Sequence, residues 1–99
     1  MFMRTIFVIS AGLIAAPAVV VAEDTASRTV EQYTCKNVMR ESGSGRDTAI
    51  AFLHGYLLGK SGSSEFNVET LTKQTDAFID RCLDDPTAKA EEVMVQIKK

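Results

Sequence analysis

Few side chains in this sequence could carry out chemistry, and they are widely separated along it. The one histidine, His54, has no cysteine, serine or second histidine at a spacing that would pair a nucleophile with a base. The neighbouring carboxylates of Asp84 and Asp85 fall at the expected end of a helix, where such residues more often form a cap than an acid/base pair. The glycines follow no strand that could present a phosphate-binding loop. We therefore expect no enzyme activity and no cofactor.

His54 has two interpretations at this point. It can be a partly buried helix residue with no further role. It can also be a pH sensor, because an unperturbed histidine titrates near pH ~6.5 and is surrounded here by apolar residues.

The two cysteines, Cys35 and Cys82, allow only one pairing. They lack the CxxC spacing of a zinc site, and one histidine does not complete such a site, so we expect no metal. A start of the chain that directs export would carry both into an oxidising compartment. A disulfide that closes a loop of this length contributes roughly 4 kcal/mol in the chain-entropy model. We predict a Cys35–Cys82 disulfide.

The first 22 residues have the pattern of a secretory signal. Arg4 supplies the positive start, residues 6–21 are almost wholly apolar, and small residues precede the polar Glu23. The alternative is an uncleaved membrane anchor, but the apolar run is shorter than the ~20 residues that a spanning helix needs. We predict a signal peptide at residues 1–22 and a mature domain at residues 23–99.

The mature chain is small and mildly acidic. It keeps all 13 acidic and 10 of the 11 basic residues, so its formal charge is 10 − 13 = −3. No basic stripe is visible, which argues against nucleic acid as a partner. The pairs Glu91-Glu92 and Lys98-Lys99 are interpreted as solvated charges. A domain of this size buries only about 60% of its unfolded surface and usually needs a staple such as a disulfide.

Hydrophobic spacing predicts four helices and no strand, after a flexible polar arm at about residues 23–32. The expected helices are a short one capped by Thr34 and stopped by residues 42–45, a central one at 47–59, a third from the cap Asn67 to about Asp84, and a last one from Asp85-Pro86 to about Ile97. The predicted fold is therefore an all-α, small four-helix domain stapled by one disulfide.

The central helix is apolar nearly all round. Its main apolar arc consists of Ala49, Ile50, Phe52, Leu53, Tyr56 and Leu57, and the opposite side carries Ala51, Gly55 and Leu58. A helix with this pattern is covered on two sides, by its own chain or by a second copy. It is either a core helix and nothing more, or in part a dimer or client-binding surface.

Three features together resemble the HdeA/HdeB family of periplasmic acid-stress chaperones. They are the run Tyr33-Thr34-Cys35, the run Thr48-Ala49-Ile50-Ala51-Phe52 after a short turn, and Cys82 at the end of the third helix. The resemblance implies a periplasmic protein with one disulfide that is a homodimer at neutral pH. It also implies that strong acid loosens the dimer, and that the exposed apolar surface then binds unfolding client proteins without ATP. We expect no membrane partner for the mature chain once the signal peptide is removed.

The resemblance also suggests a contact surface on the central helix. Phe52 stands where the family places an apolar dimer-contact residue, and Leu53, Tyr56 and Leu57 extend that surface. The small residues Ala51 and Gly55 would let another helix approach closely. The chain departs from the family in its short, weakly basic arm and in a last helix without an aromatic residue.

Charge alone supports an acid response. Below pH ~3 most carboxylates are neutral, so the charge of the mature chain moves from −3 toward about +11 with His54 and the ten Lys and Arg counted. Self-repulsion at that charge disfavours compactness and association. The disulfide would stop this loosening from becoming complete unfolding.

The leading hypothesis is an acid-activated holdase, and two others stay open. One is a periplasmic binding protein such as an immunity-type inhibitor of a secreted toxin, for which the segment Gly55-Tyr56 followed by Gly59 is weak support. The other is a structural envelope protein. A holdase suppresses aggregation of unrelated proteins only at low pH, whereas an inhibitor binds one partner tightly at neutral pH.

Overall fold

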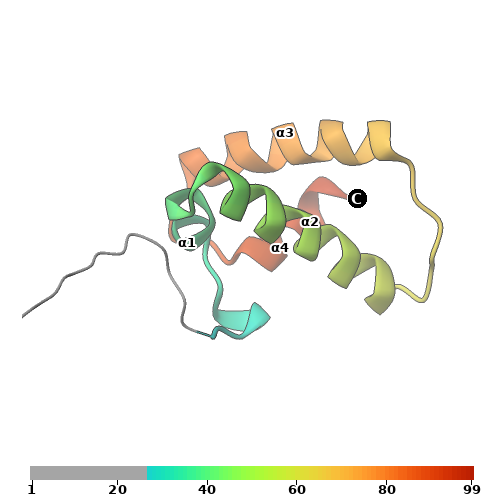
Figure 1. Cartoon of the computed structure of the whole chain (residues 1–99), viewed down its shortest axis with the longest axis horizontal. Coiled ribbons are helices and arrows are strands. Elements are labelled where there is room, and N and C mark those ends of the chain that lie inside the picture. The colour runs from blue at the N-terminus through green and yellow to red at the C-terminus, as the bar shows by residue number, and fades with distance from the viewer. Residues whose placement is uncertain (1–26) are drawn as a thin grey trace, which may run out of the picture.

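The structure is a computed structural model that describes residues 27–99 (Figure 1). The predicted signal peptide at residues 1–22, and the predicted arm as far as residue 26, lie outside the described residues. The elements are the 3-10 helix η2 (Val30–Gln32) and the α-helices α1 (Cys35–Arg40), α2 (Gly43–Lys60), α3 (Val68–Asp84) and α4 (Ala90–Ile97). Within the described part there are four α-helices and no strand, which confirms the predicted all-α class.

The central helix begins earlier than predicted, at Gly43 rather than Asp47. The Ser42 hydroxyl oxygen accepts a hydrogen bond from the Gly45 N–H at 3.3 Å, and this satisfies one of the amide groups left unpaired at the start of a helix. The Gly/Ser segment at 42–45 was predicted to be a stop for the first helix. Most of it is instead the first turn of the second helix.

The last helix begins later than predicted, at Ala90, and Asp85-Pro86 does not open it. Asp85 instead closes α3, because its N–H donates to the Arg81 carbonyl oxygen at 3.0 Å. The backbone that follows turns at residues 86–88 and is bonded to the start of α1, with an isolated bridge between Thr34 and Lys89. There the Lys36 N–H donates to the Pro86 carbonyl oxygen at 2.9 Å, so these residues cannot join a helix.

One end of the molecule is clamped by covalent and backbone bonds. The predicted disulfide between Cys35 and Cys82 is present and ties α1 to the last turn of α3. Beside it, the Cys35 N–H donates to the Ala88 carbonyl oxygen, and the Ala90 N–H donates to the Tyr33 carbonyl oxygen, each at 2.9 Å. Thr34 caps α1 as predicted, in a reciprocal capping box. We call this end the clamp.

The hydrophobic core lies at the clamp. All four helices supply its buried apolar residues, which are Cys35, Val38, Ile50, Leu53, Phe78, Cys82, Ala90, Val93 and Met94. Along α3, burial begins only at Phe78. The apolar positions of α3 therefore reach the core only in its second half, at Phe78 and Cys82, and Val68 at the other end is 67% exposed.

Away from the clamp, α2 and α3 diverge (Figure 1). The loop 61–67 joins their distant ends, and it turns at Gly62, whose φ of +80° suits glycine. The helices α1 and α4 pack against both α2 and α3, which make few direct contacts with each other. The result is a wedge that is closed at the clamp and open at the loop.

The described part of the polar arm is partly ordered by contacts. Val30 packs against the core, and the Lys89 ammonium donates to the Glu31 carbonyl oxygen at 3.1 Å. The C-terminal end of the arm predicted at residues 23–32 is therefore packed against the folded domain at η2.

Replacing both cysteines, as Cys35→Ala/Cys82→Ala, should lower the free energy of unfolding by about 2–5 kcal/mol, because the bridge spans a sequence separation of 47 and restrains the unfolded chain. Urea unfolding of the parent and the variant at neutral pH measures the difference. Equal midpoints would show that the backbone bonds of the clamp suffice without the disulfide.

Candidate functional site

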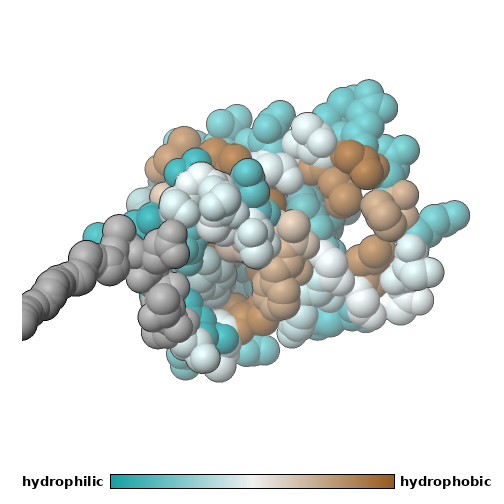
Figure 2. Space-filling model, viewed as in Figure 1, coloured by the Kyte–Doolittle hydropathy of each residue, from teal (hydrophilic) through white to brown (hydrophobic). Residues whose placement is uncertain are grey.

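The open end of the wedge contains a large cleft with a volume of about 1070 Å³. It lies between α2, the loop, the first half of α3 and the end of α4. Figure 2 shows apolar side chains gathered around the opening where α2 and α3 diverge. The apolar lining includes Ala51, Leu57, Leu58, Phe66, Leu71 and Val95. Phe66 is 64% exposed, so a large aromatic side chain stands in solvent at the mouth of the cleft.

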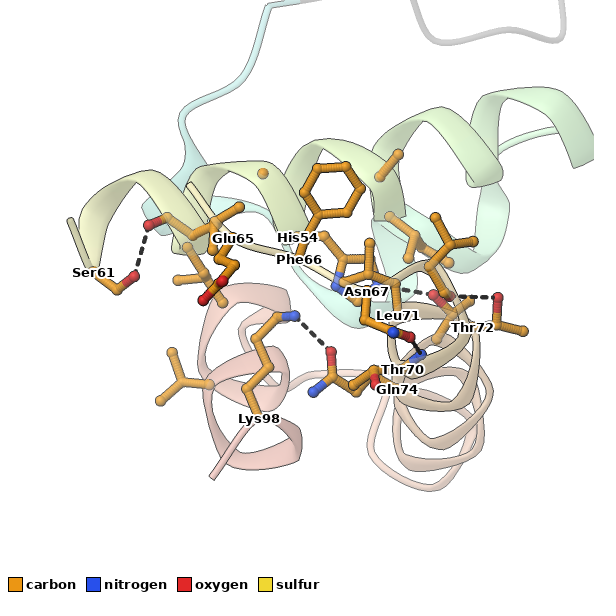
Figure 3. A pocket seen from close by; sticks show the side chains of 18 of the residues that line it. His54, Ser61, Glu65, Phe66, Asn67, Thr70, Leu71, Thr72, Gln74 and Lys98 are labelled. Atoms are coloured by element: carbon orange, nitrogen blue, oxygen red, sulfur yellow. Dashed lines mark hydrogen bonds between the residues drawn. The ribbon is translucent and has the colours of Figure 1, made fainter. Parts of the chain in front are cut away.

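His54 forms part of the inner wall of this cleft and is only 7% exposed. Its Nε2 lies 2.8 Å from the hydroxyl oxygen of Thr75 on α3, so each residue supplies a hydrogen-bond partner for the other (Figure 3). Thr75 is a polar residue between the apolar positions Leu71 and Phe78 of α3, and its contact with His54 explains why this position is polar. The other ring nitrogen, Nδ1, is buried without a hydrogen-bond partner.

Burial, together with the smaller effect of the nearby positive charge of Lys98, lowers the pKa of His54 from 6.5 to about 4. The imidazole is therefore neutral at pH 7. Because the pKa in the folded protein is below that of the unfolded chain, the neutral ring favours folding above pH ~6.5. This contribution is lost as the pH falls through about 4. The full pKa difference corresponds to at most about 3.5 kcal/mol at roughly 1.4 kcal/mol per pKa unit, most of which is lost by pH ~4.

Lys98 follows the last turn of α4 and reaches into the same cleft, although the sequence placed it among solvated charges. Its ammonium donates to the side-chain oxygen of Gln74 at 2.7 Å (Figure 3). Partial burial lowers the pKa of the Lys98 ammonium. Lys98 forms no ion pair with a carboxylate of the described residues, whereas Lys60 pairs with Glu91 at 2.9 Å.

The surface predicted on the central helix divides into three parts. Phe52, which is 51% exposed, and the partly buried Tyr56 form an aromatic pair on the outer side, with ring centroids 5.8 Å apart. Ala51, Gly55 and Leu57 line the cleft instead. Leu53 is completely buried in the core. A contact of Leu53 with a second copy or a client would require the core to loosen first, and its predicted role stays a prediction.

Gly55 has no neighbour at close range. A Cβ atom built on it would meet nothing within 4 Å, so no other helix of the described chain makes the close approach that Ala51 and Gly55 were predicted to allow. Such an approach by a second copy stays a prediction.

The sequence did not indicate the second wall of the cleft. Phe66 lies between the predicted central and third helices, and Gln74 is a polar residue of α3 to which the sequence assigned no role. A sequence signal for this wall did exist, because His54 and Thr75 each interrupt an apolar pattern and face each other in the structure.

Among residues 27–99, no group of three or more His, Cys, Asp or Glu is placed to hold a metal ion. No helix in that range is long and apolar enough to cross a membrane.

Comparison with known proteins gives one match. A sequence-family model described as the HdeA/HdeB family matches residues 1–92. No curated protein and no solved structure gives a significant match.

Replacing His54 with a residue that does not titrate should flatten the pH dependence of stability. We expect the parent to lose up to about 3 kcal/mol of unfolding free energy between pH ~6.5 and ~4 through this group. His54→Gln should lose correspondingly less over the same interval, measured by urea unfolding at several pH values. Thr75→Val, which keeps the imidazole, serves as the control and should retain the slope. Parallel slopes for the parent and His54→Gln would contradict the assignment.

Proposed function

Since the chain belongs to the HdeA/HdeB family, a family of periplasmic acid-stress chaperones, we propose that it is an acid-activated, ATP-independent holdase. In this role it binds unfolding client proteins in the periplasm at low pH and prevents their aggregation. The observation that supports this most is apolar surface left uncovered beside a core that a disulfide braces. Uncovered apolar surface is what an unfolded chain can bind. The predicted signal peptide at residues 1–22 is part of the proposal.

We further propose a homodimer at neutral pH that covers the outer face of α2. Phe52 and Tyr56 are the aromatic pair on that face, and Phe52 stays half exposed in the single chain. Aromatic side chains bury large areas and are enriched in the centres of interfaces. The Lys60 ammonium lies 5.3 Å from the Tyr56 ring and gives the patch a polar edge.

The acid step of the proposal begins at the cleft. His54 packs against Thr75 of α3, and Lys98 approaches it from the end of α4; Asp47, Lys60 and Glu65 are the other charged groups of the lining. Protonating His54 adds a positive charge beside Lys98 in a poorly hydrated site. Below pH ~3 most carboxylates are neutral as well. The ion pair of Lys60 with Glu91, which joins α2 to α4, is then lost.

These changes act on the open end of the wedge and leave the clamp in place. A disulfide does not titrate, so Cys35–Cys82 continues to hold α1 to α3 in acid. The proposed active form is therefore a loosened chain with more apolar surface exposed, rather than a fully unfolded one.

Light scattering of an aggregating generic client, with and without this protein, tests the proposal. We expect suppression of scattering near pH 2–3 and little effect at pH 7, because the apolar surface is proposed to open only when His54 and the carboxylates are protonated. Equal suppression at both pH values, or none in acid, would rule out an acid-activated holdase. Tight binding of a single partner at pH 7 would support the inhibitor alternative instead.

Phe52→Asp should separate dimerisation from client binding. At pH 7 the new carboxylate would be ionised in an apolar contact without a partner, at a cost of several kcal/mol, so we expect a monomer in sedimentation. Below about pH 3 the carboxyl is mostly neutral, and client binding should weaken only by the lost aromatic contact, about 1–3 kcal/mol.

Leu83→Asp is the matched control for this variant. Leu83 is 64% exposed on α3, so the same change there should leave the oligomeric state unaltered. A parent that sediments as a monomer at pH 7, or a Phe52→Asp variant that stays dimeric, would remove the dimer from the proposal. A monomeric variant that protects clients as well as the parent would place the client surface elsewhere.

A further inference from the structure

Two nitrogen groups beside the cleft are incompletely satisfied by the chain itself. The His54 Nδ1 atom is buried and makes no hydrogen bond within the chain. The Lys98 ammonium is partly buried and bonds to the neutral side chain of Gln74, with no carboxylate in an ion pair. A buried polar atom without a partner and a poorly solvated cation are both destabilising unless a further group satisfies them.

The space next to these nitrogens is long, open and apolar. Leu57 and Leu58 of α2 line one side, Leu71 of α3 lines the other, and Phe66 stands at the mouth (Figure 3). The volume of about 1070 Å³ lies just above the ~300–1,000 Å³ range of small-molecule sites. Gly55 lines the cleft without a side chain, and nothing lies within 4 Å of where its Cβ would be.

We propose that this cleft binds a long-chain carboxylate, with its head group on the Lys98 ammonium beside His54 and its hydrocarbon chain along Leu57, Leu58 and Phe66. A carboxylate only accepts hydrogen bonds, so it matches an ammonium donor. The hydrocarbon chain would cover the apolar lining that solvent now reaches.

The charges in the cleft favour a ligand with a single negative charge. Lys98 is the one cation near His54 that is not paired with a carboxylate in the described residues, since Lys60 pairs with Glu91. The carboxylates of Asp47 and Glu65 also line the cleft and would repel a more highly charged head group more strongly. An acidic peptide or a phosphate dianion therefore fits less well than a fatty acid.

This inference does not depend on the proposed chaperone activity. It concerns the folded protein near neutral pH, where His54 is neutral and a carboxylate is ionised, and it uses the cleft rather than the outer pair of Phe52 and Tyr56. Loss of acid-dependent client protection would leave it standing.

The first test is calorimetric titration of the full mature chain near pH 7 with octanoate, decanoate and dodecanoate below their micelle concentrations. Each added methylene that is buried should raise the affinity up to about fourfold, since burial is worth about 0.8 kcal/mol per methylene and 1.36 kcal/mol is tenfold. Decanoate should bind about tenfold more tightly than 1-decanol, as expected for a charge-assisted contact of about 1.4 kcal/mol. Affinity independent of chain length, or equal binding of the alcohol, would overturn the proposal.

Lys98→Met tests the head-group contact, with Lys99→Met as the control of equal charge change at an exposed neighbour. We expect Lys98→Met to remove the preference for decanoate over 1-decanol while leaving alcohol binding intact, and Lys99→Met to keep the preference. Glu65→Gln should strengthen decanoate binding because it removes a repelling carboxylate. An unchanged preference in Lys98→Met would contradict the assignment.

Gly55→Leu tests the hydrocarbon site. A leucine there projects into the cleft, whereas Gly59→Leu places the same side chain on α2 at a position that is outside the lining and equally open. We expect the first variant to lose about tenfold or more in affinity for dodecanoate and the second to bind as the parent does. Equal effects of the two variants, or decanoate binding that weakens as the protein concentration rises, would show that a second copy rather than a fatty acid fills the cleft.

Discussion

The disulfide between Cys35 and Cys82 is the constraint on which the rest of this structure depends. It joins α1 to the last turn of α3, and the backbone bonds of Cys35 and Tyr33 to the segment before α4 lie next to it. All three constraints act at one end of the molecule. The buried apolar residues gather at the same end, because only there are the four helices held close enough to exclude water.

At the other end of the molecule, apolar surface stays exposed to solvent. Beyond the core, α2 and α3 diverge, and the side chains of Phe66 and Val68 remain largely in solvent. Few direct contacts join the two helices, so local opening there should require much less free energy than global unfolding. A covalent brace at one end and weak packing at the other let a small chain expose binding surface and still keep its topology. That combination suits the proposed chaperone role.

His54 connects this geometry to pH. Its ring is buried between α2 and α3 with Lys98 nearby, so the charged form is poorly solvated and is repelled by a like charge. The same two residues make the wall of the cleft polar at one point, which is the basis for an anionic head group at neutral pH. Protonation of His54 and binding of a ligand would therefore act on one site, and each would alter the free energy of the other.

Sequence alone determined the helical class, the disulfide, the Thr34 and Asn67 caps and the bounds of α3, because these follow from residue type, local spacing and a single possible cysteine pairing. It misplaced the starts of α2 and α4, where the Ser42 cap and the backbone pairing of Pro86 and Ala88 override local preference. Only the tertiary structure decided which apolar positions of α2 face the core, the cleft or solvent. That choice buried Leu53, left Phe52 exposed and brought Lys98 to His54, because a helix apolar on every side does not specify which of its neighbours will cover each face.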